Sequence, residues 1–365
     1  MKPILLSLLL FSYVILLILY PKTSINAAKD ALQVWFSGII PSLFPFSVAS
    51  YLLLQTGVFR ILGKIFEKPA KFLFALPGSF IGIFLCALFS SYPTGAKMTA
   101  ALYQNGELSE KDAERMLLFS SLCGTGFLSG TVAIGFLSDA SLAPALIFGN
   151  TLPPLIFAVI SGLFHKKEKA SVINKKTFSA EIPFAKLLSE AISSSAMSML
   201  QIGGSMLVLK SFAAVLGEIF PHFLHSPVGL IFLGMLEMTT GCEAIANSTL
   251  SLHTKAVIAS FFCGFSGLSI LLQTKNAAFP IKTKCLLPYK GLQAILQAFL
   301  THLFLKYSSA SECLYMPNGI GIGLSLTAGI LFFSFLLSAL RLLQVLVQAY
   351  RSVFPCFRGR SQDIR

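Results

Sequence analysis

The sequence predicts an all-α, polytopic integral membrane protein, and three observations lead to this prediction. The 365 residues are 55% hydrophobic and 12% charged, with a mean hydropathy of +0.77, whereas soluble domains carry about 25% charged residues. The apolar residues gather in segments close to the roughly 20 residues that cross a bilayer. The basic residues behind the net charge of +13 lie in short loops between these segments. No nucleic-acid motif accompanies them, so we expect no nucleic-acid partner.

Ten apolar segments follow one another along the chain. They cover residues 3–20, 31–58, 78–104, 115–138, 142–164, 187–217, 227–250, 254–274, 285–306 and 319–349. We expect the first to be an uncleaved helix rather than a signal peptide, because its apolar core is long and no small-residue cleavage site follows Pro21. Segments 78–104 and 254–274 are interrupted by polar residues or glycines, which divides them into pieces too short to span.

The charges in the loops predict which segments cross the membrane. Lysines and arginines cluster at 60–71, 166–186, 275–290 and 351–365, and the positive-inside rule places all four regions in the cytoplasm. The third region includes Lys290. This placement requires one segment of each central pair, 78–104 with 115–138 and 227–250 with 254–274, to turn back. About eight transmembrane helices and two re-entrant or broken elements result, with both termini cytoplasmic. The charges leave open which member of each pair turns back.

Two similar polar interruptions predict an internal repeat. They read Ser90-Ser91-Tyr92-Pro93-Thr94-Gly95-Ala96-Lys97 and Leu236-Glu237-Met238-Thr239-Thr240-Gly241-Cys242-Glu243. An offset of 146 positions aligns Gly95 with Gly241, and Lys97 with Glu243. A second match, Leu122-Cys123-Gly124-Thr125-Gly126 with Phe262-Cys263-Gly264-Phe265-Ser266-Gly267, follows at an offset of 140. With the loop charges, these matches predict two repeats of opposite orientation, as in many secondary transporters.

The chain divides accordingly into six regions. These are an N-terminal transmembrane helix (1–30), a first repeat (31–164), a basic cytoplasmic linker (165–186), a second, inverted repeat (187–306), a final transmembrane helix (307–350) and a basic cytoplasmic tail (351–365). Anionic lipid head groups are the expected partners of the basic loops, because clustered lysines beside a membrane attract them.

The interruptions are where we expect a substrate to bind, because unwound backbone at membrane depth must be buried in protein or line a wet cavity. Helices that begin near Gly95 and Gly241 carry partial positive charge and free N–H groups at their N-termini, which favours an anion. The candidate substrate-binding residues are Ser91, Thr94, Gly95, Lys97, Glu237, Thr239, Thr240, Gly241, Ser269 and Gln273. For Ser269 and Gln273, helix packing is an equally good explanation.

Lys97 is the strongest single candidate. A charge at the centre of a membrane helix costs about 2.5–3.5 kcal/mol, so Lys97 should have a partner: Glu237, Glu243 or an anionic substrate. The alternative is that Lys97 snorkels to lipid head groups. Glu237 and Glu243 are candidates for ion coupling, with a structural ion pair as the alternative. Lys210 lies near the end of an apolar segment and is expected to snorkel.

Neither catalysis nor metal binding is indicated by the sequence. The five histidines are dispersed and the seven cysteines lack metal-ligand spacing. There is no phosphate-binding loop, metalloprotease motif or nucleophile elbow. We therefore expect neither an enzyme nor a cofactor.

Three stretches of the chain resemble a known family. Ile40-Pro41-Ser42-Leu43-Phe44-Pro45-Phe46, Ser91–Lys97 and Gly264–Ser269 are similar to stretches of the sporulation integral membrane proteins of YlbJ type, over about residues 5–306. Members of this family carry the nucleoside-recognition Gate domain and are similar in organisation to concentrative nucleoside transporters, which have re-entrant hairpins in an inverted repeat. Leu122–Thr125 depart from the Asn or Ser with Gly-Pro that relatives often carry there.

The resemblance implies a role in spore cortex formation, in which dipicolinate moves from the mother cell across the outer forespore membrane. Dipicolinate is a small planar dianion, so its negative charge matches the anion site that we expect at the interruptions. The prediction is a multi-pass carrier of a small organic anion in a bacterial cell membrane, with a second copy or other sporulation membrane proteins as partners. The alternatives are a non-transporting scaffold or gate in spore-envelope assembly and a nucleoside carrier.

Overall fold

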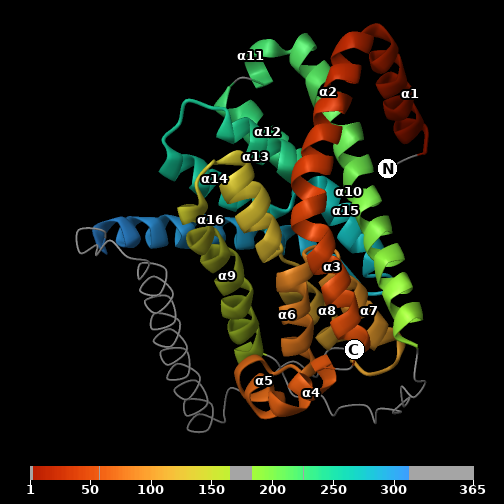
Figure 1. Cartoon of the computed structure of the whole chain (residues 1–365), viewed down its shortest axis with the longest axis vertical. Coiled ribbons are helices and arrows are strands. Elements are labelled where there is room, and N and C mark those ends of the chain that lie inside the picture. The colour runs from red at the N-terminus through yellow and green to blue at the C-terminus, as the bar shows by residue number, and fades with distance from the viewer. Residues whose placement is uncertain (1–2, 57, 165–182, 225, 312–365) are drawn as a thin grey trace, which may run out of the picture.

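The computed structural model describes residues 3–56, 58–164, 183–224 and 226–311, and every regular element in them is a helix (Figure 1). The prediction of an all-α membrane protein is confirmed. The basic linker, the last apolar segment at 319–349 and the basic tail lie outside the described residues, apart from the end of the linker.

The N-terminal region is a helical hairpin followed by two short helices. The elements are α1 (Pro3–Leu19), α2 (Pro21–Val34), η1 (Trp35–Ile39), α3 (Ile40–Gln55), α4 (Val58–Ile65) and α5 (Glu67–Phe74). Pro21 opens α2 at a position where its missing N–H would have no partner in the helix. Because α2, η1 and α3 run on as one candidate span, Pro21–Leu53, the second apolar segment begins earlier than the predicted residue 31.

The two halves of the chain then repeat one order of elements. The first half has α6 (Ser79–Ser90), α7 (Thr94–Gln104), α8 (Glu110–Ser120), η2 (Phe127–Phe136), η3 (Ala140–Leu142) and α9 (Ala143–Phe164). The second has α10 (Phe184–Ile219), α11 (Pro221–Leu224), α12 (Pro227–Leu236), α13 (Met238–Ala246), α14 (Leu252–Phe265), α15 (Gly267–Ala277) and α16 (Leu286–Ser311). Apart from α10 and α11, which open the second half, each half contains two short helices joined by a break (α6–α7 and α12–α13), a broken helix (α8–η2 and α14–α15) and a long helix (α9 and α16).

In each half, the two short helices that are joined by a break fold back on each other as a hairpin. The two pieces of the broken helix that follows run on in roughly one direction. In the second half, α12 and α13 pack against each other, and a β-carbon on Gly241 would overlap the Cα of Gly234. The next pair, α14 and α15, forms one candidate span, Leu252–Ala277. The first half agrees, since α6 packs on α7 whereas α8 and η2 make little contact. The hairpins α6–α7 and α12–α13 are therefore the segments that fold back on themselves in the structure, a choice that the loop charges left open.

Four helices in the described residues are long and apolar enough to cross a membrane, or five if the bent pair α5–α6 is one span. They are Pro21–Leu53, Ala140–Phe164, Phe184–Ile219 and Leu252–Ala277. Several predicted spans are shorter here, such as α1 at 17 residues. Although α16 has 26 residues, it is not among the candidate spans, and buried polar side chains recur along it.

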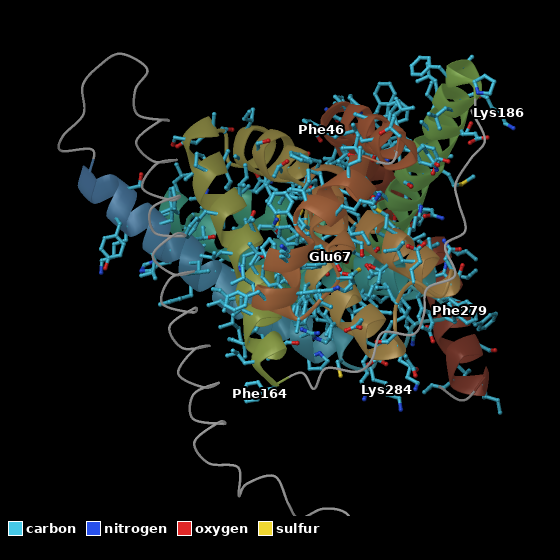
Figure 2. All side chains as sticks on the ribbon, turned by 90° about the horizontal axis from the view of Figure 1, so that it is seen from below. Phe46, Glu67, Phe164, Lys186, Phe279 and Lys284 are labelled. Atoms are coloured by element: carbon cyan, nitrogen blue, oxygen red, sulfur yellow. The ribbon has the colours of Figure 1, made fainter. Side chains whose placement is uncertain are left out.

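Loops from the two halves meet at one end of the molecule. Lys282, between α15 and α16, lies 2.6 Å from Glu110 at the start of α8, and this hydrogen-bonded carboxylate raises the pKa of Lys282. Gln104 Nε2 donates to the backbone oxygen of Phe279 at 3.0 Å. The loop at 105–114, which the charges did not place, therefore lies beside the basic region at 275–290. Figure 2 shows Lys284 of that region at the margin of the helical body.

Candidate functional site

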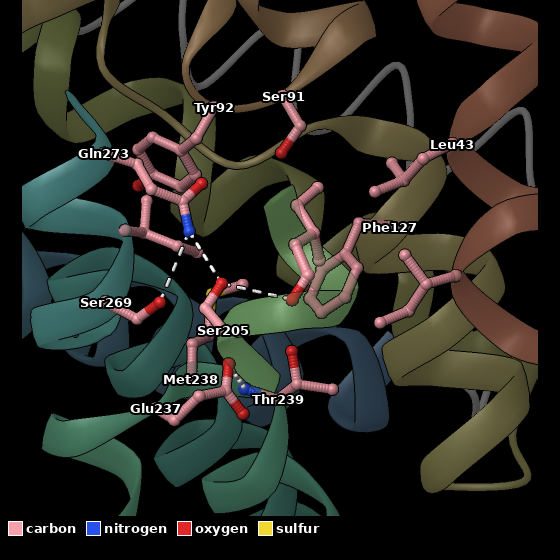
Figure 3. Close-up of a pocket in the computed structure, with 13 residues that line it drawn as sticks. Leu43, Ser91, Tyr92, Phe127, Ser205, Glu237, Met238, Thr239, Ser269 and Gln273 are labelled. Atoms are coloured by element: carbon pink, nitrogen blue, oxygen red, sulfur yellow. Dashed lines mark hydrogen bonds between the residues drawn. The ribbon is translucent and has the colours of Figure 1, made fainter. Parts of the chain in front are cut away.

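Both hairpin breaks and both broken helices contribute to the wall of one small cavity (Figure 3). The wall is made by Ile39, Leu43, Ser91, Tyr92, Phe127, Ile202, Ser205, Glu237, Met238, Thr239, Ser269, Ile270 and Gln273. The cavity has a volume of about 20 Å³, which is room for about one water molecule. Residues far apart in the sequence thus converge on a single small site.

Each hairpin tip rests on a glycine of the broken helix in its own half. A β-carbon on Gly124 would stand 2.8 Å from the β-carbon of Ser91, and one on Gly267 would stand 2.8 Å from the backbone nitrogen of Met238. These contacts make Gly124 the counterpart of Gly267. They correct the sequence match at an offset of 140, which set Gly124 against Gly264: Gly264 lies inside α14, before its break.

Glu237 forms the tip of the second hairpin. Its carboxylate accepts hydrogen bonds from the backbone nitrogens of Thr239 at 3.0 Å and Thr240 at 2.6 Å, and from the Thr240 hydroxyl at 2.8 Å. The residue is 4% exposed and caps the N-terminus of α13, where the partial positive charge of a helix favours an anion. The donors that the sequence assigned to a substrate are therefore occupied by a carboxylate of the chain itself.

Ser91 takes the corresponding place at the tip of the first hairpin, 146 positions before Glu237. It is buried and has a φ of +68° with a ψ of −178°, a backbone conformation that is found almost only at glycine. The N-terminus of α7, which follows, has no side-chain cap. Figure 3 shows Ser91 and Glu237 on opposite sides of the cavity. One tip thus carries its own carboxylate and the other has a hydroxyl and an uncapped helix.

The structure separates the expected partners Lys97 and Glu243. Lys97 is exposed, and its Nζ donates to the Ser198 hydroxyl at 3.3 Å, with no ion pair recorded to either expected glutamate. Glu243 instead forms an ion pair with Lys210 at 2.7 Å. The expectation that Lys210 snorkels is therefore wrong. Ser198, the partner of Lys97, and Lys210, the partner of Glu243, both lie on α10. The 12 positions between them span about 18 Å of helix.

The cavity lies between these two charged groups. Ser205, which lines it, stands between Ser198 and Lys210 on α10. Lys97 and Glu243 are thus anchored toward opposite ends of that stretch of α10. Equivalent residues of an inverted repeat are expected to lie on opposite sides of the central site, which explains why these two do not meet.

The remaining candidate residues divide into wall and packing positions. Ser91, Glu237, Thr239, Ser269 and Gln273 line the cavity. Gln273 Nε2 donates to the hydroxyls of Ser205 at 2.9 Å and Ser269 at 3.3 Å. The candidates outside the wall are Thr94, Gly95, Lys97, Thr240 and Gly241. A β-carbon on Gly95 would overlap the backbone oxygen of Ser120, and Gly241 packs on Gly234, so both glycines serve close helix packing.

A second, wider depression lies beside Glu243. Its volume is about 370 Å³, and it is lined by Val34, Ser37, Gly38, Thr131, Gly135, Phe136, Glu243, Ala246 and Asn247. Elements η1 and η2 border both spaces, since Gly38 is followed by Ile39 of the small cavity and Thr131 lies one turn beyond Phe127. The depression and the small cavity are therefore neighbouring spaces that share these two elements as walls.

One curated protein is similar to this chain. The chain is 30% identical to the sporulation integral membrane protein YlbJ of Bacillus subtilis (strain 168), over 288 residues that cover 70% of each protein. The chain belongs to the YlbJ family of sporulation integral membrane proteins. No protein-family model matches it, and no solved structure matches it. It is therefore a multi-pass membrane protein with a membrane role in sporulation.

The sequence patterns did not point to Lys290 as a site residue of this YlbJ-family protein. Lys290 was assigned to a cytoplasmic basic region, but it lies inside α16 and is 1% exposed. Its Nζ donates to Tyr92 Oη at 2.9 Å, to Gln293 Oε1 at 2.9 Å and to the backbone oxygen of Ser121. The signal was present: Lys290, Gln293, Gln297 and Thr301 recur at helical spacing in the apolar segment 285–306.

Asn150 is a second residue that the patterns missed. Its side chain reaches from α9 to the unwound segment after α8. Nδ2 donates to the backbone oxygen of Cys123 at 2.9 Å, and Oδ1 accepts from the Cys123 nitrogen at 3.3 Å. Asn150 is fully buried. It satisfies backbone groups that the break leaves without a helical partner, as buried backbone requires.

Proposed function

We propose that this YlbJ-family protein is a carrier of a small organic anion and that its substrate is dipicolinate, moved across the outer forespore membrane. The observation that carries the proposal is the asymmetry of the two hairpin tips. Glu237 places a carboxylate on the N-terminus of α13 with three hydrogen bonds. The corresponding helix of the first half, α7, has no side-chain cap and Ser91 in the glutamate's place.

A substrate carboxylate suits the first tip because it would repeat the contacts that Glu237 makes at the second. A half-helix N-terminus inside a transporter favours an anionic group. Ser91 adds a hydroxyl, and the aromatic rings of Tyr92 and Phe127 line the same cavity. A planar aromatic ring that bears carboxylates, such as dipicolinate, matches this combination better than an uncharged nucleoside does.

Binding requires the cavity to widen, because its present volume of about 20 Å³ accommodates roughly one water. The hairpins are the elements that we expect to move, since each touches its broken helix through a glycine. The wider depression beside Glu243 is the entry to the cavity from one side, and Lys97 is a positive charge on the approach from the other.

Uptake of labelled dipicolinate and of a labelled nucleoside into proteoliposomes tests this function. The wild-type protein should take up dipicolinate and exclude the nucleoside. Ser91→Asp should lower dipicolinate uptake at least about tenfold, because a fixed carboxylate at the first tip repels an anion in a dry site. Ser91→Asn is the matched control, since it has nearly the same shape without the charge and should retain most uptake.

Three results would count against the proposal. Nucleoside uptake without dipicolinate uptake would favour a nucleoside carrier. Uptake of neither compound by folded protein would favour a scaffold or gate. Equal dipicolinate uptake by the Asp and Asn variants would mean that the first tip does not receive the anion.

A further inference from the structure

The ammonium group of Lys290 connects the two halves of the protein at a buried point. Lys290 belongs to α16 in the second half, yet its Nζ contacts Tyr92 at the first hairpin tip and the backbone oxygen of Ser121. Ser121 is the C-terminal cap of α8, where the first broken helix unwinds. The third contact is Gln293 Oε1, one turn along α16. Lys290 thus contacts Tyr92, which lines the cavity, but is not itself part of the cavity wall.

The hydrogen bonds around Nζ match the charged form of the side chain. An ammonium has three N–H donors, and three acceptors surround it: Tyr92 Oη, Gln293 Oε1 and the Ser121 oxygen. The Tyr92 hydroxyl can then donate its own hydrogen to the backbone oxygen of Cys263 at 3.3 Å. A neutral amine would instead accept from Tyr92, and the Cys263 oxygen would lose this donor.

No carboxylate in the described residues is recorded in an ion pair with Lys290. The titratable groups that face it are the Tyr92 hydroxyl and the Cys123 thiol, and Tyr289 neighbours it on its own helix. An unpaired charge inside a membrane protein is costly and marks a functional position. This charge is compensated by oxygen atoms, one of them a carbonyl at the negative end of α8, and by the Tyr92 ring, whose centroid lies 4.8 Å from Nζ.

A ring of oxygens at the unwound part of a broken membrane helix is how carriers hold a coupling cation. We propose that the oxygens of Tyr92, Ser121 and Gln293 form a monovalent-cation site that the ammonium of Lys290 occupies in place of a free ion. This tethered cation holds the first hairpin tip against the first broken helix. In the second half, Met238 stands at the position of Tyr92, and Ser266 caps the end of α14. In combination with the proposed function, the consequence is that transport requires no Na⁺.

Thermal unfolding of the purified, full-length protein in detergent tests the site without any transport assay. Lys290→Ala should leave the oxygens without a cation and lower the unfolding midpoint by about 5 °C in choline chloride. Na⁺ or methylammonium at equal ionic strength should restore at least half of this loss, because each is small enough to enter the vacated space. Lys290→Met fills that space without charge, so it should be destabilised and should not respond to either cation.

The wild-type midpoint should be the same in sodium and choline chloride. A wild-type protein that Na⁺ stabilises would overturn the proposal, as would a Lys290→Ala variant that ignores both small cations or a Lys290→Met variant as stable as the wild type. If Lys290→Ala does not fold, the wild-type comparison and Lys290→Met decide. Dipicolinate uptake that requires Na⁺ would also overturn the proposal, whereas absent uptake under every condition would refute only the proposed function.

Discussion

Gly124 lies so close to Ser91 that a β-carbon on the glycine would stand 2.8 Å from the β-carbon of the serine. The second half repeats this contact between Gly267 and Met238. In both places a hairpin tip meets a broken helix nearly backbone to backbone. The two contacts are therefore the points at which the tips must separate from the broken helices if the cavity is to widen.

Alanine at Gly124 should push the first tip away from its broken helix and destabilise the protein by about 1–3 kcal/mol, the usual effect of overpacking. Gly267→Ala should be at least as harmful, because Gly267 also has a φ of +71°, which costs an L-residue about 1 kcal/mol more. Gly204→Ala is the control, since no atom lies within 4 Å of its added β-carbon. Thermal unfolding in detergent measures all three. Equal midpoints for the Gly124 and Gly204 variants would contradict the close contact.

Loss of the Glu237 carboxylate should free the N-terminus of α13. We expect Glu237→Ala to lower the free energy of unfolding by roughly 2 kcal/mol, the upper range for a helix cap. Glu237→Gln keeps one acceptor oxygen and should lose less. Hydrogen exchange at the Thr239 and Thr240 amides should rise in the alanine variant. Unchanged exchange at both amides would show that the carboxylate does not cap the helix in solution.

The ion pair between Lys210 and Glu243 should be detectable as a coupling energy. The side chains are 13% and 27% exposed, so partial solvent screening limits the pair to roughly 1 kcal/mol. A double-mutant cycle with Lys210→Met and Glu243→Gln measures the coupling by thermal unfolding. High salt should reduce it. A coupling energy of zero at low salt would mean that the pair does not form.

Neutralising Lys97 should affect transport and leave stability nearly unchanged. Its Nζ contacts a single hydroxyl, that of Ser198, so Lys97→Gln should shift the free energy of unfolding by no more than about 0.5 kcal/mol. We expect spores with the Gln variant to contain less dipicolinate, and Lys97→Arg, which keeps the charge, to be close to the wild type. Normal dipicolinate content with stable Gln variant would remove Lys97 from the anion route.

The sequence located the two breaks well because glycine, proline and hydroxyl residues are conspicuous in apolar segments. Ser91 and Glu237 both line the cavity that these breaks predicted. The second match aligned Gly124 with the wrong glycine of its partner stretch, because glycine and cysteine are common in this chain and the contact of Gly267 with the hairpin tip is visible only in the structure. The sequence offset made Lys97 and Glu243 equivalent positions of the two repeats. Equivalent residues of an inverted repeat lie on opposite sides of the central site, so they do not pair with each other.

Lys290 shows a different limit of sequence reasoning. A lysine near the start of an apolar segment is indistinguishable from a loop residue in a charge count, because depth depends on where the helix begins. The helix begins at Leu286, so Lys290 falls in its second turn. Its direction toward Ser121 and Tyr92 depends on the packing of α16 against the first half, which no local pattern encodes.

The volume of the central cavity has a consequence for the cell. Protons cross a barrier rapidly along chains of hydrogen-bonded waters, and a space of about 20 Å³ holds about one water. Such a space cannot contain a chain of waters. In this conformation the cavity between the hairpin tips therefore offers protons no chain of waters, which would limit proton leakage through the proposed carrier in the cell.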